Sequence, residues 1–231
     1  MNNTSRITIL IALYKAGEFI KSKLESLKNQ TIIDNSTIVF LNCQNRDNET
    51  VLCEEFASTR PNVINIVFDK YISLYDSWNI GITKTNSEYI VNYNADDQWH
   101  PSYLEKCCDY LDLNQDIAIV STGVLITNIP NQIWPNWIYH DKIPSHPYPL
   151  STAGPCPVWR RKLHEKYGLF GSYHVIGDAR MWEKFHSGGE KFGVINEDLA
   201  LYYCSQESLE RRRDNITGQL LRDIDLETKF D

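Results

Sequence analysis

The first half of the chain alternates between two hydrophobic periods. Residues 7–13 form a nearly continuous apolar run, which is typical of a strand buried on both faces of a sheet. Residues 16–30 then repeat their apolar side chains at helical spacing, with Lys and Glu between them. The alternation continues and predicts strands over residues 36–41, 63–68, 88–93 and 117–127, with helices that begin at Asp47, Ser73 and Pro101. Four β–α units followed by a fifth strand predict an α/β fold, with a mostly parallel, doubly wound, Rossmann-like sheet and helices on both faces.

The pattern changes near residue 129. Residues 130–149 carry Trp134, Trp137 and further aromatic side chains among five prolines, without a clear period. Long irregular loops in compact domains are often lids or binding loops. Aromatic faces suit stacking on sugar rings, and the alternative is that these side chains only plug the domain. Beyond this loop we expect a helix that ends at Tyr167, a helix that begins at Gly177, one or two strands within residues 192–204, and a terminal amphipathic helix over residues 208–226.

The strand predicted over residues 88–93 runs directly into two adjacent carboxylates, Asp96 and Asp97. Neighbouring carboxylates repel each other and cost stability unless a cation lies between them and their partners. The carboxyl ends of parallel strands are also where open α/β sheets bind ligands. These residues therefore indicate a divalent metal ion that carries an anion, such as a diphosphate. The alternative interpretation is a solvated acidic turn, because Asp is a common turn residue.

Composition and missing motifs exclude several classes of partner. The formal net charge is −7, and no basic stripe is present that would neutralise the phosphates of a nucleic acid. The turn at residues 12–17 lacks the Gly-x-Gly-x-x-Gly of dinucleotide-binding folds, and the chain has no Walker-type loop. We therefore expect no nucleic acid, no dinucleotide and no P-loop nucleotide site.

The cysteines and the N-terminus bear on the compartment of the protein. Six cysteines occur without a Cys-x-x-Cys pair, and we expect all of them to be reduced thiols, with Cys107 and Cys108 inside a helix. The apolar run at residues 7–13 is too short for the core of a signal peptide or for a membrane span. The sequence therefore predicts a cytoplasmic location, including the periphery of a membrane, and no transmembrane segment.

Six short motifs occur along the chain in a characteristic order. They are the strand and turn of residues 7–14, Ser-Leu-x-x-Gln-Thr at 26–31, Asn-x-Gly-Ile at 79–82, Asn-Ala-Asp-Asp at 94–97 with His-Pro at 100–101, the Trp-Arg-Arg segment of 159–170, and Gly-Asp-x-x-x-Trp at 177–182. Through these motifs the chain resembles the family-2 inverting glycosyltransferases with the GT-A fold, over roughly residues 6–208. The resemblance implies one domain, in which residues 1–128 bind the nucleotide-sugar and residues 129–231 bind the acceptor and carry the catalytic base.

The resemblance also implies roles for individual residues. Donor binding is expected of Ala12, Tyr14, Asn42, Asn79, Asn94, Ala95 and Asp96. Binding of Mn²⁺ or Mg²⁺ is expected of Asp96, with Asp97 in support. Acceptor binding is expected of Trp134, Trp137, Trp159, Arg160 and Trp182. The catalytic base is expected to be Asp178, for which the alternative role is the N-cap of the helix that begins there.

Two asparagines depart from the family's pattern. Where the family has paired Asp residues after its second strand, this chain has Asn42, which offers a base both a carbonyl acceptor and an amide donor. The first acid of the metal motif is replaced by Asn94, whose oxygen can still bond a ribose hydroxyl or complete a metal shell. Metal binding would then rest mainly on Asp96.

The activity implied by the resemblance is sugar transfer from a nucleotide-diphosphate sugar, with a UDP-sugar favoured, to a glycan, lipid-linked or protein hydroxyl. Transfer would invert the anomeric carbon, depend on a metal ion and serve polysaccharide biosynthesis. One alternative is a sugar nucleotidyltransferase, which uses a similar sheet and metal but grips a triphosphate with a Gly-rich basic loop. The other is a non-catalytic homologue that only binds a nucleotide or glycan, an interpretation that Asn42 and Asn94 keep open.

Overall fold

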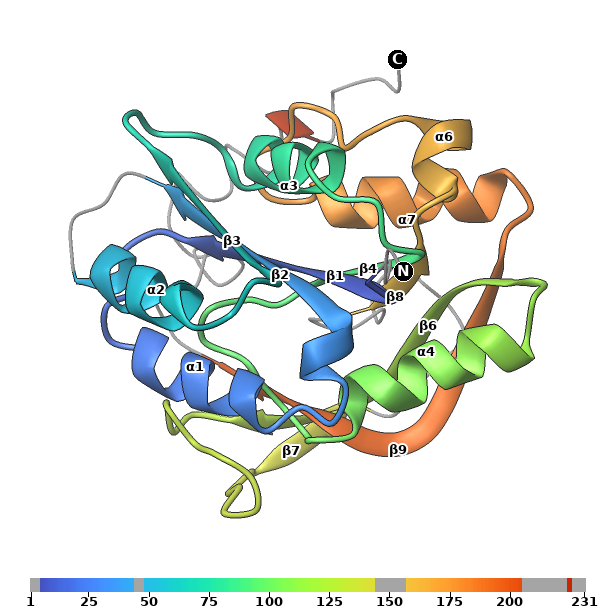
Figure 1. The fold of residues 1–231 in the computed structure, drawn as a ribbon. Helices are drawn as coiled ribbons and strands as arrows, with labels where there is room; N and C mark the ends of the chain where they lie inside the picture. Colours follow the sequence, from blue (N-terminus) through green and yellow to red (C-terminus); the bar gives the residue numbers. More distant parts are fainter. Residues whose placement is uncertain (1–4, 44–47, 144–156, 205–223, 226–231) are drawn as a thin grey trace.

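The computed structural model describes residues 5–43, 48–143, 157–204 and 224–225. Within these residues, nine strands form one sheet with helices on both faces (Figure 1). The strand order is β3-β2-β1-β4-β8-β6-β9-β5, and β7 pairs with β6. The predicted α/β class is confirmed.

The amino-terminal half builds the parallel part of the sheet. β1 (Ile7–Leu13) lies between β2 (Ser36–Cys43) and β4 (Tyr89–Asn92), and β3 (Val63–Phe68) pairs with β2. All four strands run in the same direction, so their carboxyl ends meet at one edge of the sheet. We call this the carboxyl edge, and the segments that follow β1, β3 and β4 leave the sheet there.

In the parts of the chain that the structure describes, helices cover both faces of the sheet. On one face lie α1 (Ile20–Lys28), α2 (Glu49–Ser58) and α4 (Tyr103–Leu113). On the other face lie α3 (Leu74–Thr83), α6 (Leu163–Tyr167) and α7 (Gly177–Ser187) (Figure 1). The start of α3 is fixed by Ser73, whose hydroxyl accepts the backbone N–H of Asp76 at 3.2 Å, as expected of an N-cap serine.

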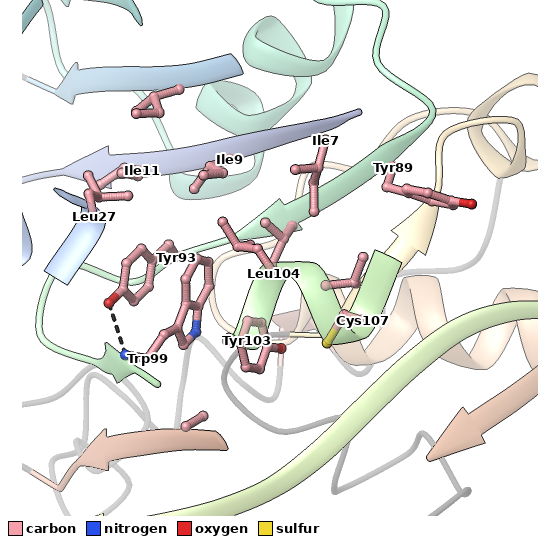
Figure 2. Close-up of a cluster of buried hydrophobic side chains, with 14 of the residues drawn as sticks. Ile7, Ile9, Ile11, Leu27, Tyr89, Tyr93, Trp99, Tyr103, Leu104 and Cys107 are labelled. Atoms are coloured by element: carbon pink, nitrogen blue, oxygen red, sulfur yellow. Dashed lines mark hydrogen bonds between the residues drawn. The ribbon is translucent and has the colours of Figure 1, made fainter. Parts of the chain in front are cut away.

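Side chains of β1 alternate between two hydrophobic cores. Ile7, Ile9 and Ile11 point into the core shared with α1, α2 and α4, which we call the α1 core (Figure 2). Leu10 points the other way, into the core shared with α3, α6 and α7, which we call the α7 core. Because both faces of β1 are covered, the strand is apolar without alternation.

The carboxy-terminal half of the sheet is mostly antiparallel. β8 (Val158–Arg160) lies between β4 and β6 (Ile117–Thr127) and runs antiparallel to both. β9 (Lys191–Tyr203) is one long strand parallel to β6, with β5 (Gln98–Trp99) antiparallel to β9 and β7 (Asp141–Ile143) antiparallel to β6. The fifth predicted strand therefore forms where expected, but the short β8 separates it from the parallel strands.

The described cysteines are free thiols, as predicted. Cys43, Cys53, Cys107, Cys108 and Cys204 form no disulfide, and Cys156 lies outside the described residues. Cys107 and Cys108 are buried neighbours in α4. Burial raises the pKa of Cys43 to about 11 and that of Cys53 to about 12, so both thiols stay protonated at neutral pH.

The helix predicted over residues 208–226 lies outside the described residues, except for a helical turn at residues 224–225. Of the helices that the structure describes, none combines the length and the apolar character needed to cross a lipid bilayer.

Candidate active site

The acidic turn after β4 is closed at both ends by stacked aromatic rings. Tyr93 stacks on Trp99 of β5, with ring centroids 3.4 Å apart and an interplanar angle of 5°. The backbone N–H of Trp99 also donates to the Tyr93 hydroxyl at 3.0 Å (Figure 2). Ser26 of α1 lies 2.6 Å from the same hydroxyl. Residues 94–98 are thereby held in a fixed turn against the α1 core.

A buried lysine lies next to this turn. Lys23 of α1 has no exposed surface, and its ammonium nitrogen is 3.0 Å from the centroid of the Tyr93 ring. The same ammonium donates a hydrogen bond to the backbone carbonyl of Asp97. Lys23 was not among the residues predicted from the sequence, although its position carried a signal. It stands in the apolar pattern of α1, between Ile20 and Leu24, where a solvated lysine would not be expected.

Asp97 is fully enclosed by the protein. One carboxylate oxygen accepts the backbone N–H of Tyr203 at 3.1 Å, and the other accepts the side-chain amide of Asn94 at 3.0 Å. Burial, and then the neighbouring charge of Asp96, raises the pKa of Asp97 well above its usual range, whereas Lys23 and the two hydrogen bonds oppose the shift. Both oxygens of this expected metal ligand are thus bonded to the protein, and they tie the turn to the end of β9.

Asp96 is the half-buried acid of the pair. Burial raises its pKa, and its own backbone N–H and the charge of Lys23 oppose that shift. In the described ranges, no three His, Cys, Asp or Glu side chains converge on one point. Mg²⁺ is often held by one or two carboxylates while substrate phosphates and water complete its shell. Asp96 fits such a site, because a cation would offset the cost of burying its charge.

A second acid, Asp178, lies in the first turn of α7. The N-cap of α7 is Ile176, so Asp178 does not take the N-cap role that the sequence left open. One carboxylate oxygen of Asp178 accepts the backbone N–H of Ala179 at 2.8 Å and the hydroxyl of Tyr75 at 3.1 Å. The positive end of the helix dipole favours the ionised form of an acid at this position.

Tyr75 links the start of α7 to the start of α3. Its side chain is buried, and the single proton of its hydroxyl is shared between Asp178 and the backbone carbonyl of Val175, which lies 2.8 Å from the hydroxyl oxygen. Burial, and then the charge of Asp178, raises the pKa of Tyr75 well above its usual value, so the phenol remains a hydrogen-bond donor. A Cβ atom at Gly177 would meet the Tyr75 ring at 2.7 Å. Gly177 therefore permits the close approach that brings Tyr75 to Asp178.

A third acid reaches the same loop from the far end of the chain. Asp225 is fully buried, and its carboxylate accepts the backbone N–H groups of His174 at 2.8 Å, Val175 at 2.6 Å and Ile176 at 3.0 Å. These three donors immediately precede α7. No motif in the sequence marked Asp225 or Tyr75, because their roles depend on contacts between distant segments.

Comparison with known proteins identifies the family. Residues 8–173 match the sequence model of Glycosyl transferase family 2. The chain belongs to this family. The matched segment includes β1 to β4 and the acidic turn, and it ends shortly before Asp178.

Two relatives illustrate the range of similarity within the family. An uncharacterized glycosyltransferase of Methanocaldococcus jannaschii is 24% identical over 202 residues, which cover 85% of this chain and 70% of that protein. An uncharacterized glycosyltransferase of Haemophilus influenzae is 26% identical over 155 residues, which cover 62% of this chain. The chain spans about half of the Haemophilus protein, 47% of its length.

Two solved structures share the fold. TarS of Staphylococcus aureus, residues 1–349, has a TM-score of 0.70 at 14% identity, covering 93% of this chain and 65% of that chain. The mannosyltransferase PcManGT of Pyrobaculum calidifontis, in complex with GDP-Man and Mn²⁺, has a TM-score of 0.69 at 15% identity, covering 99% of this chain and 66% of that chain. These likenesses confirm the predicted GT-A fold.

An exposed aromatic pair lies at the carboxyl edge of this family-2 chain. Tyr14 follows β1 and is 45% exposed, while Tyr71 follows β3 and is 65% exposed. Their rings meet edge to face with centroids 5.7 Å apart. Ala12, near the end of β1, and Ala95, in the acidic turn, are half-buried at the same edge. Tyr71 was not predicted as a site residue, because the sequence offered only one signal for it, its position just after a predicted strand.

Two of the asparagines expected to bind the donor form hydrogen bonds with other residues of the protein. Asn42 is buried at the end of β2, where its amide donates to Asn65 of β3 at 2.5 Å. Asn79 of α3 donates to the backbone carbonyl of Phe170 at 2.8 Å and accepts the N–H of the same residue at 3.0 Å. Asn79 thus clamps the segment after α6 onto α3.

Three residues expected at the acceptor have structural roles instead. Trp159 is fully buried and Trp182 is 3% exposed, and their rings pack 5.1 Å apart in the α7 core. Arg160 is 3% exposed and donates to the backbone carbonyls of Leu111 at 2.5 Å and Ile117 at 2.7 Å. Arg160 pairs with the first residue of β4, so it lies at the end of that strand opposite the acidic turn. Nothing in the local sequence distinguishes these three buried side chains from exposed aromatic and basic ones.

The aromatic loop keeps two of the expected acceptor residues near the surface. Trp134 is 40% exposed and meets the rings of His100 and Trp137 edge to face, at 4.4 Å and 5.2 Å. Gln132 holds this part of the loop, because its side-chain amide donates to the Ile138 carbonyl at 3.0 Å and accepts that residue's N–H at 2.5 Å. Residues 144–156 of the loop lie outside the described residues.

Proposed function

We propose that this chain is a metal-dependent glycosyltransferase that moves a sugar from a nucleotide-diphosphate sugar to a hydroxyl acceptor with inversion. One observation carries the proposal. The carboxyl edge receives one acid from each face of the sheet, Asp96 on the turn after β4 and Asp178 in the first turn of α7. Asp178 is bonded to Tyr75 at the start of α3, which follows the carboxyl end of β3. Two acids at one edge suit a reaction that needs a leaving-group cation and a base.

On the donor side, Asp96 would bind Mn²⁺ or Mg²⁺ together with the diphosphate of the donor. When bound, such an ion neutralises the charge that develops on the diphosphate as the glycosidic bond breaks. The stacked Tyr93 and Trp99 keep the turn from moving as the ligand binds. Asp97 and Asn94 shape the turn through their mutual hydrogen bond, and the half-buried Asp96 is left as the metal-binding carboxylate.

On the acceptor side, Asp178 would act as the general base. The acceptor oxygen forms its bond to the anomeric carbon while the bond from that carbon to the diphosphate breaks. The hydroxyl proton would pass to the Asp178 carboxylate, and inversion follows because the acceptor oxygen attacks the anomeric carbon on the face opposite the leaving group. The N-terminal end of the α7 dipole favours a negative charge at this position, and the Tyr75 hydroxyl would orient the Asp178 carboxylate.

The nucleotide would lie against Tyr14 and Tyr71, whose exposed rings suit stacking on a base. We favour a UDP-sugar donor, because TarS has been solved in complex with UDP-GlcNAc, with a TM-score of 0.71 at 12% identity to this chain. PcManGT, solved with GDP-Man and Mn²⁺, supports the metal and makes GDP-sugars the second donor class to test. Trp134 and Trp137 would stack on sugars of a glycan, lipid-linked or protein-linked acceptor, as polysaccharide biosynthesis requires.

The deciding experiment is a panel of UDP- and GDP-sugars titrated into the full chain by calorimetry, with Mn²⁺ and with EDTA, followed by assay of nucleotide release. We expect the chain to bind one donor class and to hydrolyse it slowly. Both the binding and the hydrolysis should require the metal. Equally tight binding in EDTA would contradict the role of Asp96. Release of pyrophosphate from a nucleoside triphosphate and a sugar phosphate would identify a nucleotidyltransferase. Binding without turnover, with any acceptor offered, would identify a non-catalytic homologue.

A further inference from the structure

Three consecutive backbone N–H groups converge on one buried carboxylate. Asp225 accepts hydrogen bonds from His174, Val175 and Ile176, and its side chain has no exposed surface. A buried carboxylate is costly unless it is fully hydrogen-bonded, and bonds to its charged form are stronger than bonds between neutral groups. The loop that leads into α7 is therefore held by an acid from a segment about 50 residues away in sequence, as the separations of 49, 50 and 51 residues show.

A planar peptide connects this carboxylate to the Tyr75 hydroxyl. The carbonyl of Val175 and the N–H of Ile176 belong to the same peptide unit, which is rigid and planar. Asp225 accepts the N–H end of that unit at 3.0 Å, while the Tyr75 hydroxyl donates to its carbonyl end at 2.8 Å. The orientation that Asp225 gives to this peptide therefore sets where the Tyr75 hydroxyl lies.

The same hydroxyl bonds to Asp178. Tyr75 Oη lies 3.1 Å from Asp178 Oδ1 and 2.8 Å from the Val175 carbonyl, so both acceptors share its single proton. A connected set of polar contacts therefore runs from Asp225 through the peptide and Tyr75 to Asp178. Figure 1 shows the short red segment of residues 224–225 near α3, and the hydrogen bonds of Asp225 place this segment at the start of α7. The path joins the carboxy-terminal segment to the acid that the proposed function uses as its base.

We propose that Asp225 is a positioning residue for catalysis, which fixes the Val175–Ile176 peptide and, through it, the Tyr75 hydroxyl against Asp178. This inference rests on the proposed function, because it assigns Asp225 to the same reaction. Asp225 does not contact the substrate. Its effect on turnover comes from the orientation of the Asp178 carboxylate, and small displacements of a reacting group cost large factors in rate.

The test uses Asp225→Asn and Asp225→Ala in the full chain. Asn keeps one acceptor oxygen and so loses part of the three-bond cluster, whereas Ala loses all of it. We expect kcat to fall about tenfold for Asn and about 100-fold for Ala, with the donor KM within about twofold of wild type. Amide hydrogen exchange at residues 174–176 should accelerate in both variants, while exchange in α1 stays unchanged. Asp116→Asn, which alters an exposed acid paired with Lys191, is the matched control and should change neither readout.

A double-mutant cycle with Tyr75→Phe separates positioning from general destabilisation. If Asp225 acts through the Tyr75 hydroxyl, the two substitutions should not be independent. The fold-loss of kcat in the double variant, Tyr75→Phe with Asp225→Asn, should then be smaller than the product of the fold-losses in the two single variants. Unchanged kcat in Asp225→Asn, multiplicative losses in the cycle, or exchange that accelerates equally throughout the chain would overturn the proposal. If the Asp225→Ala variant does not fold, the Asp225→Asn variant and the double-mutant cycle still test whether Asp225 positions Asp178.

The proposed function and the positioning role of Asp225 can fail separately. A wild-type chain that transfers no sugar from any donor refutes the proposed function and, with it, a catalytic role for Asp225. Exchange at residues 174–176 would in that case still report whether Asp225 holds the loop. A wild-type chain that transfers sugar, together with an Asp225→Asn variant of full kcat, refutes only the positioning role.

Discussion

The two acids that we assign to the reaction are supported in different ways by the two faces of the sheet. On the α1 face, Asp96 stands beside an enclosed second acid, Asp97, and near the buried cation Lys23. On the α7 face, Asp178 is bonded by neutral donors, the Tyr75 hydroxyl and the Ala179 N–H. The charge of Lys23 therefore contributes to the surroundings of Asp96, and two neutral hydrogen bonds contribute to those of Asp178.

The difference matches what each acid has to do. A metal-binding carboxylate must stay ionised and need never take up a proton, so a nearby ammonium is compatible with its role. A general base must be ionised and then accept a proton, and a close cation would oppose that step by favouring the charged form. A neutral phenol orients the carboxylate of Asp178 with a smaller effect on its basicity. The contrast agrees with the proposal that Asp96 binds the metal and Asp178 accepts the proton.

Asp178→Asn should have the largest effect, because it removes the proton acceptor while preserving the oxygen that bonds to Tyr75 and Ala179. We expect kcat to fall about 10²- to 10⁴-fold, the usual range for loss of a general base, with donor affinity unchanged. Steady-state kinetics together with donor titration calorimetry measure the two effects. The matched control is Glu183→Gln on the same helix, where only a pair with Arg180 on one side of α7 is lost. An Asp178→Asn variant with near-wild-type turnover would break the comparison, since proton transfer would belong elsewhere.

Lys23→Met should have the next largest effect, on stability. Removing the buried cation leaves Asp96 and Asp97 without the charge that offsets their burial, and breaking such an arrangement typically costs about 3–5 kcal/mol. The free energy of unfolding in urea, measured without metal, is the readout. Lys28→Met on the same helix is the control, because Lys28 is exposed and pairs with Glu25 at 3.3 Å. Equal effects of the two substitutions would show that Lys23 does not support the acidic turn.

Gly177→Ala should disturb the position of Asp178 through a change in packing rather than a change in charge. The added Cβ would meet the Tyr75 ring at 2.7 Å, and overpacking of this kind costs about 1–3 kcal/mol. Displacement of Tyr75 should also lower kcat, by about tenfold. Gly188→Ala at the other end of α7 is the control, because its Cβ would meet the Tyr167 hydroxyl at 2.1 Å, remote from Asp178. It should lower the melting temperature similarly and leave kcat unchanged; equal losses of kcat would refute the link to Tyr75.

The sequence predicted the segment from β1 to the acidic turn better than the surroundings of α7, for a physical reason. Strands β1 to β4 are local apolar runs, and the turn at Asp96 follows one of them directly, so short-range patterns were sufficient. The insertion of β8 between β4 and β6 depends on pairing between distant segments. Burial of Arg160, for which acceptor binding was expected, depends on the same long-range packing. Tyr75 and Asp225 could not be identified, because each contacts Asp178 or its loop across at least 49 residues.

The smallest expected effect concerns pH, and it should appear on the α7 face. His164 Nε2 accepts the indole N–H of Trp159 at 2.9 Å, and His164 Nδ1 lies 2.9 Å from the backbone carbonyl of Gly168. This pairing fits the neutral ring with its proton on Nδ1, because a protonated ring would direct a second N–H at the indole N–H of Trp159. Burial, as the largest cause, lowers the pKa of His164 below its ordinary value.

The sign of the pH effect follows from the direction of that shift. The unfolded chain takes up a proton at His164 at a higher pH than the folded chain, so the stability from the neutral ring is complete above about pH 6.5 and is lost as the pH falls through the lower folded pKa. Thermal unfolding between pH 7.5 and pH 5 should therefore show a declining midpoint in the wild type and a flatter profile in His164→Gln. His140→Gln, at an exposed position, is the control and should keep the wild-type slope. Identical slopes in all three proteins would show that protonation of His164 does not weaken the α7 core, and the contrast between the two faces would then rest on Asp96 and Asp178 alone.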